Sequence, residues 1–502
     1  MKKIIINIFL TLLFSSALIF PQVQNYNLNL VSNIEFENDA NNFGVSDVWG
    51  YTDETGVEYA IVGYRFGTSI IDVSTDPSNP IEVYNIPGPS SYDYYYHRDY
   101  KTYGDYLYIV NEMFGDDTGM QVVDLSPLPY SAPIKLETYS SIEQSHNLWI
   151  DPDGLVFIEH YSGDNIQIAD LSSPSEPSYL GSFGSLAPGC HDIYSANGIA
   201  YISEGNNGFG IYDISNIGSI IQLAEIIPPS SGYAHNAWLS LDGNHLVTTE
   251  ETQGKTVKVW DISDFENINL KGEYLGENGL AHNVHVMGNF VYISHYTTGL
   301  KVVDIYDPQN PVEVAAFDTY PQNDNGGFYG CWGAFPFTSN NFVYASDMQN
   351  GLFILEHNQK RAGWNYGKIY DYSGQPIFNY TLRSITNLKE YNANGEDYFI
   401  GHPEGSHQFE LILNDEVLEE LILEFVGYET IETNIYLNDE GFIEGDINQD
   451  QLVDILDVVF LVNIILGQYS PTAFESVIAN INGDLSVNVQ DIILLVNIIL
   501  LF

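Results

Sequence analysis

A short phrase recurs seven times between residues 67 and 357 and constrains the fold more than any other feature. Each copy is an apolar run that ends in an acidic residue followed by one further residue, and the acidic residues stand 43 to 52 residues apart. The copies are GTSIIDV (67–73), GMQVVDL (119–125), NIQIADL (165–171), GFGIYDI (208–214), TVKVWDI (256–262), GLKVVDI (299–305) and GLFILEH (351–357). A period in the forties that carries several short β segments is typical of β-propeller blades.

One repeat shows how a blade is built. Residues 281–317 contain four apolar segments, AHNVHV, NFVYISHY, GLKVVDI and PVEVAAF. Short breaks rich in Gly and Asn separate them, which is the chemistry of hairpin turns. Each repeat is therefore predicted to be a four-stranded antiparallel meander, with strands a to d running from the ring axis outward.

The last repeat has no segment for its outer strand, because the composition changes at Gln359. The only unassigned segment of strand character is NLNLVSNIEFE (27–37), which precedes the first repeat. Supplying the missing strand from there would close the ring and protect its open edges. We therefore predict a mainly β protein whose residues 23–358 form a seven-bladed propeller closed by an N-terminal strand.

The first residues and the charge indicate where the protein works. Residues 1–22, MKKIIINIFLTLLFSSALIFPQ, read as a secretory signal peptide, with a retained N-terminal anchor as the alternative. The sequence predicts a secreted or cell-surface bacterial protein without a transmembrane domain. A net charge of −52 argues against nucleic acid and anionic membranes as partners. Two cysteines, Cys190 and Cys331, do not make a disulfide scaffold.

Histidines recur where strand a begins. Four repeats start SHNLW (145–149), CHDIY (190–194), AHNAW (234–238) and AHNVH (281–285). Strand b runs back antiparallel, so its end should lie beside these starts near the channel mouth. We expect His146 beside His160, His191 beside Glu204, His235 beside Glu250, and His282 beside His295.

Two interpretations of this cluster stay open. Imidazoles and carboxylates together suit a transition metal and could activate a bound water. Alternatively, each His–Asp or His–Asn unit hydrogen-bonds the backbone of its own blade, and its repetition in nearly every blade favours this, since a metal needs only three or four ligands. Rim aromatics such as Tyr233 and Trp332 would instead suit a carbohydrate.

Two further domains follow the repeats. Residues 359–443 contain alternating strands separated by Ser-Gly, Asn-Gly and Glu-Gly turns, which predicts a small β-sandwich. Residues 444–502 hold two copies of a polar loop followed by an apolar helix. Calcium loops use positions 1, 3, 5, 7, 9 and 12. These are Asp446, Asn448, Asp450, Leu452, Asp454 and Asp457 in the first loop, and Asn480, Asn482, Asp484, Ser486, Asn488 and Asp491 in the second.

The two loops depart from a standard calcium loop in two ways. Position 6 is usually Gly but is Gln451 in the first loop and Leu485 in the second. The second loop opens with Asn480 and has fewer charged positions. We expect calcium in the first loop and weaker binding in the second, with a degenerate, metal-free pair as the alternative.

Three resemblances follow from these residues. The repeats resemble LVIVD repeats, and residues 46–80 resemble the start of the secreted choice-of-anchor B family, which implies an exported propeller with an exchangeable attachment module and no known activity. The middle block resembles a carboxypeptidase-regulatory-like domain, which implies a spacer. The matching residues are Gly367, Asp371, Gly374, Pro376, Gly395, Tyr398, Gly405, Gly427 and Tyr428. The tail resembles a type I dockerin, which implies calcium and a cohesin-like partner.

The leading hypothesis is a non-enzymatic binding or scaffold propeller that is attached or assembled through a calcium-binding tail. One rival is a metal-dependent enzyme that uses the channel mouth. The other is a carbohydrate-binding component of polysaccharide degradation. No Ser-His-Asp motif, phosphate loop or HExxH zinc motif stands out in the sequence.

Overall fold

The computed structural model describes residues 25–89, 97–113, 115, 118–159, 166–323, 325–371, 374–437, 443, 445–471, 473–482, 484 and 486–501. The predicted signal peptide (1–22) and His160 lie outside these residues. Within the described ranges, no helix has both the length and the apolar character needed to cross a membrane. Both cysteines are free thiols.

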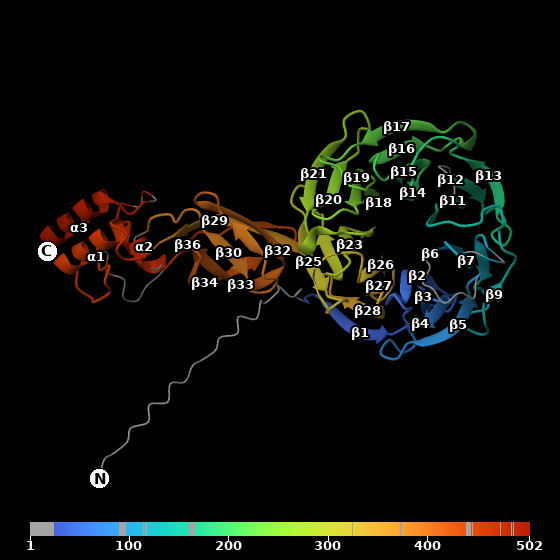
Figure 1. Ribbon diagram of the computed structural model, residues 1–502, viewed down its shortest axis with the longest axis horizontal. Coiled ribbons are helices and arrows are strands. Elements are labelled where there is room, and N and C mark those ends of the chain that lie inside the picture. The colour runs from blue at the N-terminus through green and yellow to red at the C-terminus, as the bar shows by residue number, and fades with distance from the viewer. Residues whose placement is uncertain are drawn as a thin grey trace, which may run out of the picture.

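Seven four-stranded antiparallel sheets, numbered here 1 to 7, are arranged as a ring (Figure 1). Sheet 1 contains β2 (Val45–Thr52), β3 (Glu58–Tyr64), β4 (Gly67–Asp72) and β5 (Ile81–Pro87). Sheet 2 contains β6 (Arg98–Tyr103), β7 (Tyr106–Asn111), β8 (Gln121–Asp124) and β9 (Ile134–Lys135). Sheet 3 contains β10 (Leu148–Ile150), β11 (Leu155–Glu159), β12 (Ile166–Asp170) and β13 (Ser178–Ser182). Each sheet is a meander in chain order.

The next three sheets repeat this order. Sheet 4 contains β14 (Asp192–Ala196), β15 (Ile199–Ser203), β16 (Phe209–Asp213) and β17 (Ile221–Ile226). Sheet 5 contains β18 (Ala234–Leu239), β19 (His245–Glu250), β20 (Val257–Asp261) and β21 (Asn269–Tyr274). Sheet 6 contains β22 (Val284–Met287), β23 (Phe290–Ser294), β24 (Leu300–Asp304) and β25 (Val312–Phe317). Short 3-10 turns are η1 (Ile217–Ser219) and η2 (Glu277–Gly279).

Sheet 7 joins the two ends of the ring. It contains β26 (Cys331–Phe335), β27 (Phe342–Asp347) and β28 (Gly351–His357), and its outer strand is β1 (Leu28–Ile34). β1 runs antiparallel to β28, with Leu28 opposite His357. The structure thus places the N-terminal segment at the edge where the sequence expected it.

The repeated acidic residue has a structural task in the turn after strand c. In six sheets one of its side-chain oxygens accepts a hydrogen bond from the backbone N–H two residues later, at 2.8 to 3.2 Å. These residues are Asp72, Asp124, Asp170, Asp213, Asp261 and Asp304. Such a bond fixes the turn that leads to the outer strand, which explains why the phrase recurs without forming a common site.

Two smaller parts follow the ring (Figure 1). One sheet of the middle part contains β29 (Ala362–Tyr370), β32 (Asp397–Pro403), β35 (Thr430–Glu432) and β36 (Ile435–Tyr436). The other contains β30 (Thr381–Ser384), β31 (Glu390–Asn392), β33 (Gly405–Leu413) and β34 (Glu416–Phe425). A buried apolar cluster that includes Ile369, Leu382, Phe409 and Leu423 draws on both sheets. The tail contains α1 (Ile455–Ile465), α2 (Ala473–Ala479) and α3 (Val489–Leu501).

The middle part is packed directly against sheet 6. Ala362 and Trp364 of β29 belong to the same buried cluster as Val312 and Val314 of β25. The Tyr306 and Tyr428 rings lie 4.0 Å apart, centroid to centroid. This shared core fixes the middle part to one side of the ring, away from the ring axis.

Candidate functional site

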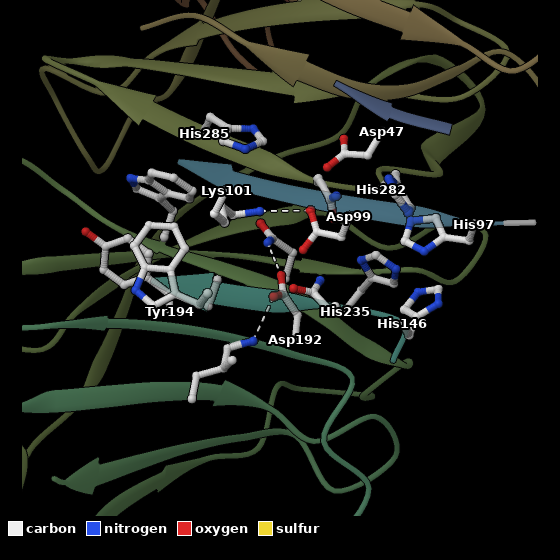
Figure 2. A pocket seen from close by; sticks show the side chains of 17 residues that line it. Asp47, His97, Asp99, Lys101, His146, Asp192, Tyr194, His235, His282 and His285 are labelled. Carbon is white, nitrogen blue, oxygen red and sulfur yellow. Dashed lines mark hydrogen bonds and ion pairs between the residues drawn. The ribbon is translucent and has the colours of Figure 1, made fainter. Parts of the chain in front are cut away.

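Six aromatic side chains from six successive sheets form a closed circle around the ring axis. We call this set the histidine ring: His97, His146, His191, His235, His282 and Trp332. Neighbouring ring centroids lie 4.2 to 5.3 Å apart all the way round, including the closing contact between Trp332 and His97. Each residue stands within two residues of the start of strand a in its sheet, so the repeat itself brings them together. His97, His146, His235 and His282 are labelled in Figure 2.

A layer of carboxylates and amides lies next to the histidine ring and connects neighbouring sheets. Oδ2 of Asp99 accepts a hydrogen bond from the Leu148 backbone N–H at 2.8 Å, and its Oδ1 contacts Nζ of Lys101 at 2.9 Å. Asn236 donates to Asp192 and accepts from the Val284 backbone N–H at 3.0 Å. The bonds from Leu148 to Asp99, from Asn236 to Asp192 and from Val284 to Asn236 cross from one sheet to the next. The sequence-based structural interpretation expected such bonds to stay within one blade.

Aromatic side chains pack below this layer. Trp149, Tyr194 and Trp238 contact one another with centroids 4.6 to 5.2 Å apart, and Phe337 stacks on Trp238 at 5.5 Å. His285 lies 4.7 Å from Trp238. Between the histidine ring and these aromatics is a cavity of about 30 Å³, which is room for one or two waters.

Burial controls the protonation of the histidine ring. Removal from water lowers the pKa of His97, His191, His235 and His282, so these imidazoles are neutral at neutral pH. His146 differs: burial opposes its charge, but the hydrogen bond with Glu112 and the nearby Glu159 carboxyl raise its pKa to about 9. Burial raises the pKa of Glu159 itself to about 8.

Several buried polar atoms of this region find no hydrogen-bond partner among the described residues. They are Nδ1 of His97, Nε2 of His191, Nε1 of Trp332 and Oε2 of Glu159. Leaving such atoms unpaired costs about 1–3 kcal/mol each. The concentration of unpaired donors and acceptors at one mouth of the channel indicates a place where water or a ligand completes the bonding.

Two glutamates bring carboxylates to the histidine ring. Oε1 of Glu112 lies 2.6 Å from Nδ1 of His146, in a direct hydrogen bond. Oε1 of Glu251 lies 3.7 Å from Nε2 of His235 and 4.0 Å from Nε2 of His282. In each group, His97–Glu112–His146 and His235–Glu251–His282, the three potential metal-binding atoms lie within 4.8 Å of one another.

The predicted channel-mouth residues are only partly brought together. His146, His191, His235 and His282 are members of the histidine ring. Glu204 instead accepts a hydrogen bond from the Tyr212 hydroxyl at 2.6 Å, and Glu250 pairs with Lys258 at 2.5 Å. Nδ1 of His295 lies 2.7 Å from Oγ1 of Thr298. His160, predicted to lie beside His146, is outside the described residues.

A β-bulge explains why Glu251, and not Glu250, reaches the ring. The pairing of β18 with β19 runs Ala234 to Glu250 and then Asn236 to Thr249, which leaves His235 unpaired at a shift of register. The bulge turns His235 toward the axis. Glu250 and Glu251 both stand at the end of strand b, and a simple alternation, which does not include this shift, pairs His235 with Glu250 instead of Glu251. HRDY (97–100) occupies the same place in its repeat, and this register places His97 with the other histidines although it was not among the predicted pairs.

The two tail loops have one hydrogen-bonding scheme. In the first, the Asp457 carboxylate accepts from the backbone N–H of Asn448 at 3.0 Å and of Asp454 at 2.9 Å. In the second, Asp491 accepts from Asn482 at 3.1 Å and Asn488 at 2.8 Å. Both aspartates are fully buried. The last position of each loop thus ties its third and ninth positions together.

The remaining predicted loop residues lie around these aspartates. Asp450 donates its backbone N–H to Asp446 at 3.0 Å, and Asp484 donates its own to Asn480 at 3.3 Å. Ser486 donates its backbone N–H to Asp484 at 3.1 Å. The Leu452 side chain is exposed, as expected for a position that would offer only its carbonyl. Leu485 lies outside the described residues.

The LVIVD repeat family matches residues 192–224 and 278–319. The first match begins with β14 and ends within β17, and the second contains β22 to β25, so one repeat corresponds to one sheet. The chain therefore contains LVIVD repeats in a β-propeller-type fold. No curated protein sequence was found to match the chain.

Solved structures are similar at low identity. A streptogramin B lyase is 12% identical, with a TM-score of 0.46 over 67% of this chain and 98% of that one. A virginiamycin B lyase from Staphylococcus aureus is 12% identical, with a TM-score of 0.45 over 66% and 99%. The computationally designed Ika8 protein is also 12% identical, with a TM-score of 0.43 over 65% and 99%.

Proposed function

We propose that this protein is a secreted or cell-surface, non-enzymatic binding or scaffold protein, attached or assembled through a calcium-binding tail. Residues 23–358 would be a seven-bladed propeller that presents the binding surface. Residues 359–443 would be a carboxypeptidase-regulatory-like β-sandwich that acts as a spacer, and residues 444–502 a dockerin-like module. The observation that carries the proposal is the matched pair of buried aspartates, Asp457 and Asp491, at the same position of two loops.

Calcium fits the chemistry of the first loop. Four carboxylates stand at its donor positions, on Asp446, Asp450, Asp454 and Asp457. Burial together with Asp446 raises the pKa of Asp457. Residues 444–502 contain no Lys, Arg or His, so the tail itself offers no countercharge. Oxygen donors of this kind prefer Ca²⁺. Asp446, Asn448, Asp450, the Leu452 carbonyl, Asp454 and Asp457 would hold the ion.

The second loop would hold calcium less tightly. It offers two carboxylates at its donor positions, on Asp484 and Asp491, where the first loop offers four. Asn480, Asn482, Ser486 and Asn488 supply neutral oxygens, which attract a divalent cation less than carboxylates do. The matching backbone hydrogen bonds to Asp457 and Asp491 support the same fold for both loops, and the difference in charge supports a lower calcium affinity in the second.

The surface of the tail helices supports a protein partner. Ile455 is 64% exposed, Leu456 55% and Val459 52%, all on α1, and Val489 and Ile493 of α3 are similarly exposed. A small module that exposes this much apolar surface is expected to be covered by a partner. The dockerin resemblance favours a cohesin-like protein as this partner. The exposed apolar side chains of the helices, in place of polar ones, would then select it.

Calcium titration of the full chain tests the proposal. We expect two sites by isothermal titration calorimetry after chelator treatment, the first tighter than the second. Asp457→Ala should remove the tighter site and Asp491→Ala the weaker one. Asp264→Ala, which removes an exposed loop aspartate of sheet 5, is the control and should keep both. Two unchanged sites in the Asp457→Ala/Asp491→Ala double variant, or no binding by the parent, would refute the calcium tail.

A further inference from the structure

The histidine ring contains one group whose donors converge without touching. We propose that Nε2 of His235, Nε2 of His282 and Oε1 of Glu251 form a binding site for a single divalent cation of the zinc class at the channel mouth. The site is separate from the tail loops in position and chemistry. It would add a nitrogen-rich metal centre to the propeller, and it does not depend on calcium binding by the tail.

The spacing of the three atoms suits a metal better than a hydrogen bond. The carboxylate oxygen lies 3.7 Å from one imidazole nitrogen and 4.0 Å from the other, too far for direct bonding. Ligands held about 2.0–2.2 Å from a tetrahedral zinc ion stand about 3.3–3.6 Å from one another. A contraction of a few tenths of an ångström would bring the carboxylate oxygen to this distance from both nitrogens, and all three atoms already lie within 4.8 Å of one another.

A backbone carbonyl sets the tautomer of His282. Nδ1 of His282 lies 2.6 Å from the carbonyl oxygen of Trp332. A carbonyl oxygen can only accept, so Nδ1 must carry the hydrogen, and Nε2 presents its lone pair toward Glu251. Orientation of a metal-binding imidazole through its other nitrogen is the usual arrangement around zinc.

Glu251 is oriented by a tyrosine. The hydroxyl of Tyr296 donates a hydrogen bond to Oε1 of Glu251, the oxygen that faces the two imidazoles. The Tyr296 ring is packed against His282, with centroids 5.2 Å apart, and against Phe328 at 5.4 Å. A fixed carboxylate is the second element that a preorganised metal site requires.

Burial prepares the site for a metal and leaves it accessible. The side chains of His235 and His282 are at most 5% exposed, while that of Glu251 is 16% exposed. Desolvation lowers the pKa of both imidazoles, so no proton competes for their lone pairs at neutral pH. Solvent reaches the site at the carboxylate, where a fourth position would take water or an oxygen ligand.

The corresponding group on the other side of the ring has a different arrangement. Glu112 and His146 already share a hydrogen bond of 2.6 Å, and the His97 ring lies over His146 at 4.3 Å and 26°. The raised pKa of His146 gives this pair a proton rather than a free lone pair. Glu112 is therefore a matched control for Glu251.

Cobalt binding to the full chain tests the site. The chelator-treated protein is titrated with Co²⁺ while excess Ca²⁺ occupies the tail loops. We expect one Co²⁺ per chain with the strong visible absorption of four-coordinate cobalt. Glu251→Gln should weaken binding about 100-fold or more, and Tyr296→Phe, which removes the hydroxyl that orients Glu251, about 10-fold. Glu112→Gln should bind as the parent does.

Each outcome of the cobalt titration either supports or overturns the site. Circular dichroism and the melting temperature establish that Glu251→Gln is folded, and the milder Tyr296→Phe variant gives a second measurement. The absence of stoichiometric Co²⁺ in the parent would overturn the site. So would a Glu112→Gln variant that loses as much affinity as Glu251→Gln, because the metal would then lie elsewhere in the ring. The heat of calcium binding, measured on the same chelator-treated proteins before Ca²⁺ is added in excess, reports on the tail loops independently.

Discussion

The histidine ring and the tail loops both bring together side chains suited to metals. The side chains of the ring come from distant parts of the chain, whereas those of each loop come from one short segment. The ring takes one residue from each of six sheets, between His97 and Trp332. Each tail loop takes its donors from 12 consecutive residues, such as Asp446 to Asp457. The ring therefore exists only when the propeller has closed, whereas a tail loop needs little more than its own turn and the following helix.

The chemistry of the two regions follows from this difference. Burial holds His97, His191, His235 and His282 neutral, and neutral imidazoles favour borderline metals such as Zn²⁺. The loop carboxylates are held by backbone N–H groups in a segment without basic residues, which favours Ca²⁺. Under the two proposals, one chain would keep two kinds of cation apart by using imidazole nitrogens in the ring and oxygen donors in the tail.

Opening the ring gives the largest expected effect. Deleting residues 25–37 removes β1, exposes the edge of β28 and loses the burial of Leu28. We expect the free energy of unfolding of the ring to fall by several kcal/mol. In a domain of this size, this lowers the melting temperature by about 10 °C or more. Deleting residues 444–502 should leave the ring transition in place. Differential scanning calorimetry measures both, and an unchanged ring transition without β1 would show that closure does not stabilise the fold.

His285, below the ring, makes stability depend on pH. Burial lowers its pKa to about 3, with smaller effects from Lys101 and Asp99. An unfolded histidine has a pKa of about 6.5, so the unfolded chain binds the proton first as the pH falls. His285 thus costs stability progressively between pH 6.5 and pH 3, at up to about 1.4 kcal/mol per pH unit.

Replacing His285 by Phe should remove this cost. The free energy of unfolding of His285→Phe, relative to the parent, is expected to rise as the pH falls from 7 to 4, measured by urea denaturation. The control Phe337→Leu changes packing in the same cluster without removing a titratable group, so its difference from the parent should stay constant. A pH-independent difference for His285→Phe would mean that the imidazole is hydrated in the folded protein.

The sequence allowed the candidate donors of the tail loops to be assigned more completely than those of the histidine ring, for a physical reason. The period of the repeated phrase places every strand a, so His146, His191, His235 and His282 could be assigned to one mouth. The carboxylate partner could not be assigned, because the bulge at His235 shifts the register by one residue and exchanges Glu250 for Glu251. Bulges leave no fixed pattern in residue type. In the tail the proposed donors are local, so the spacing of the residues was enough to propose all of them.

Gln451 offers the smallest and most local test of this contrast. It occupies position 6 of the first loop with φ +71°, in the left-handed region that glycine adopts without cost. Its backbone N–H donates to Asp446 at 2.7 Å, a bond that Gly retains. Gln451→Gly should remove about 1 kcal/mol of backbone strain from the calcium-bound loop, which is about fivefold tighter calcium binding when the calcium-free loop relaxes out of this conformation. Gln451→Ala keeps the Cβ atom and should show no gain in calorimetric titration. Equal gains in both variants would assign the effect to the Gln side chain, and neither variant should affect cobalt binding at the histidine ring.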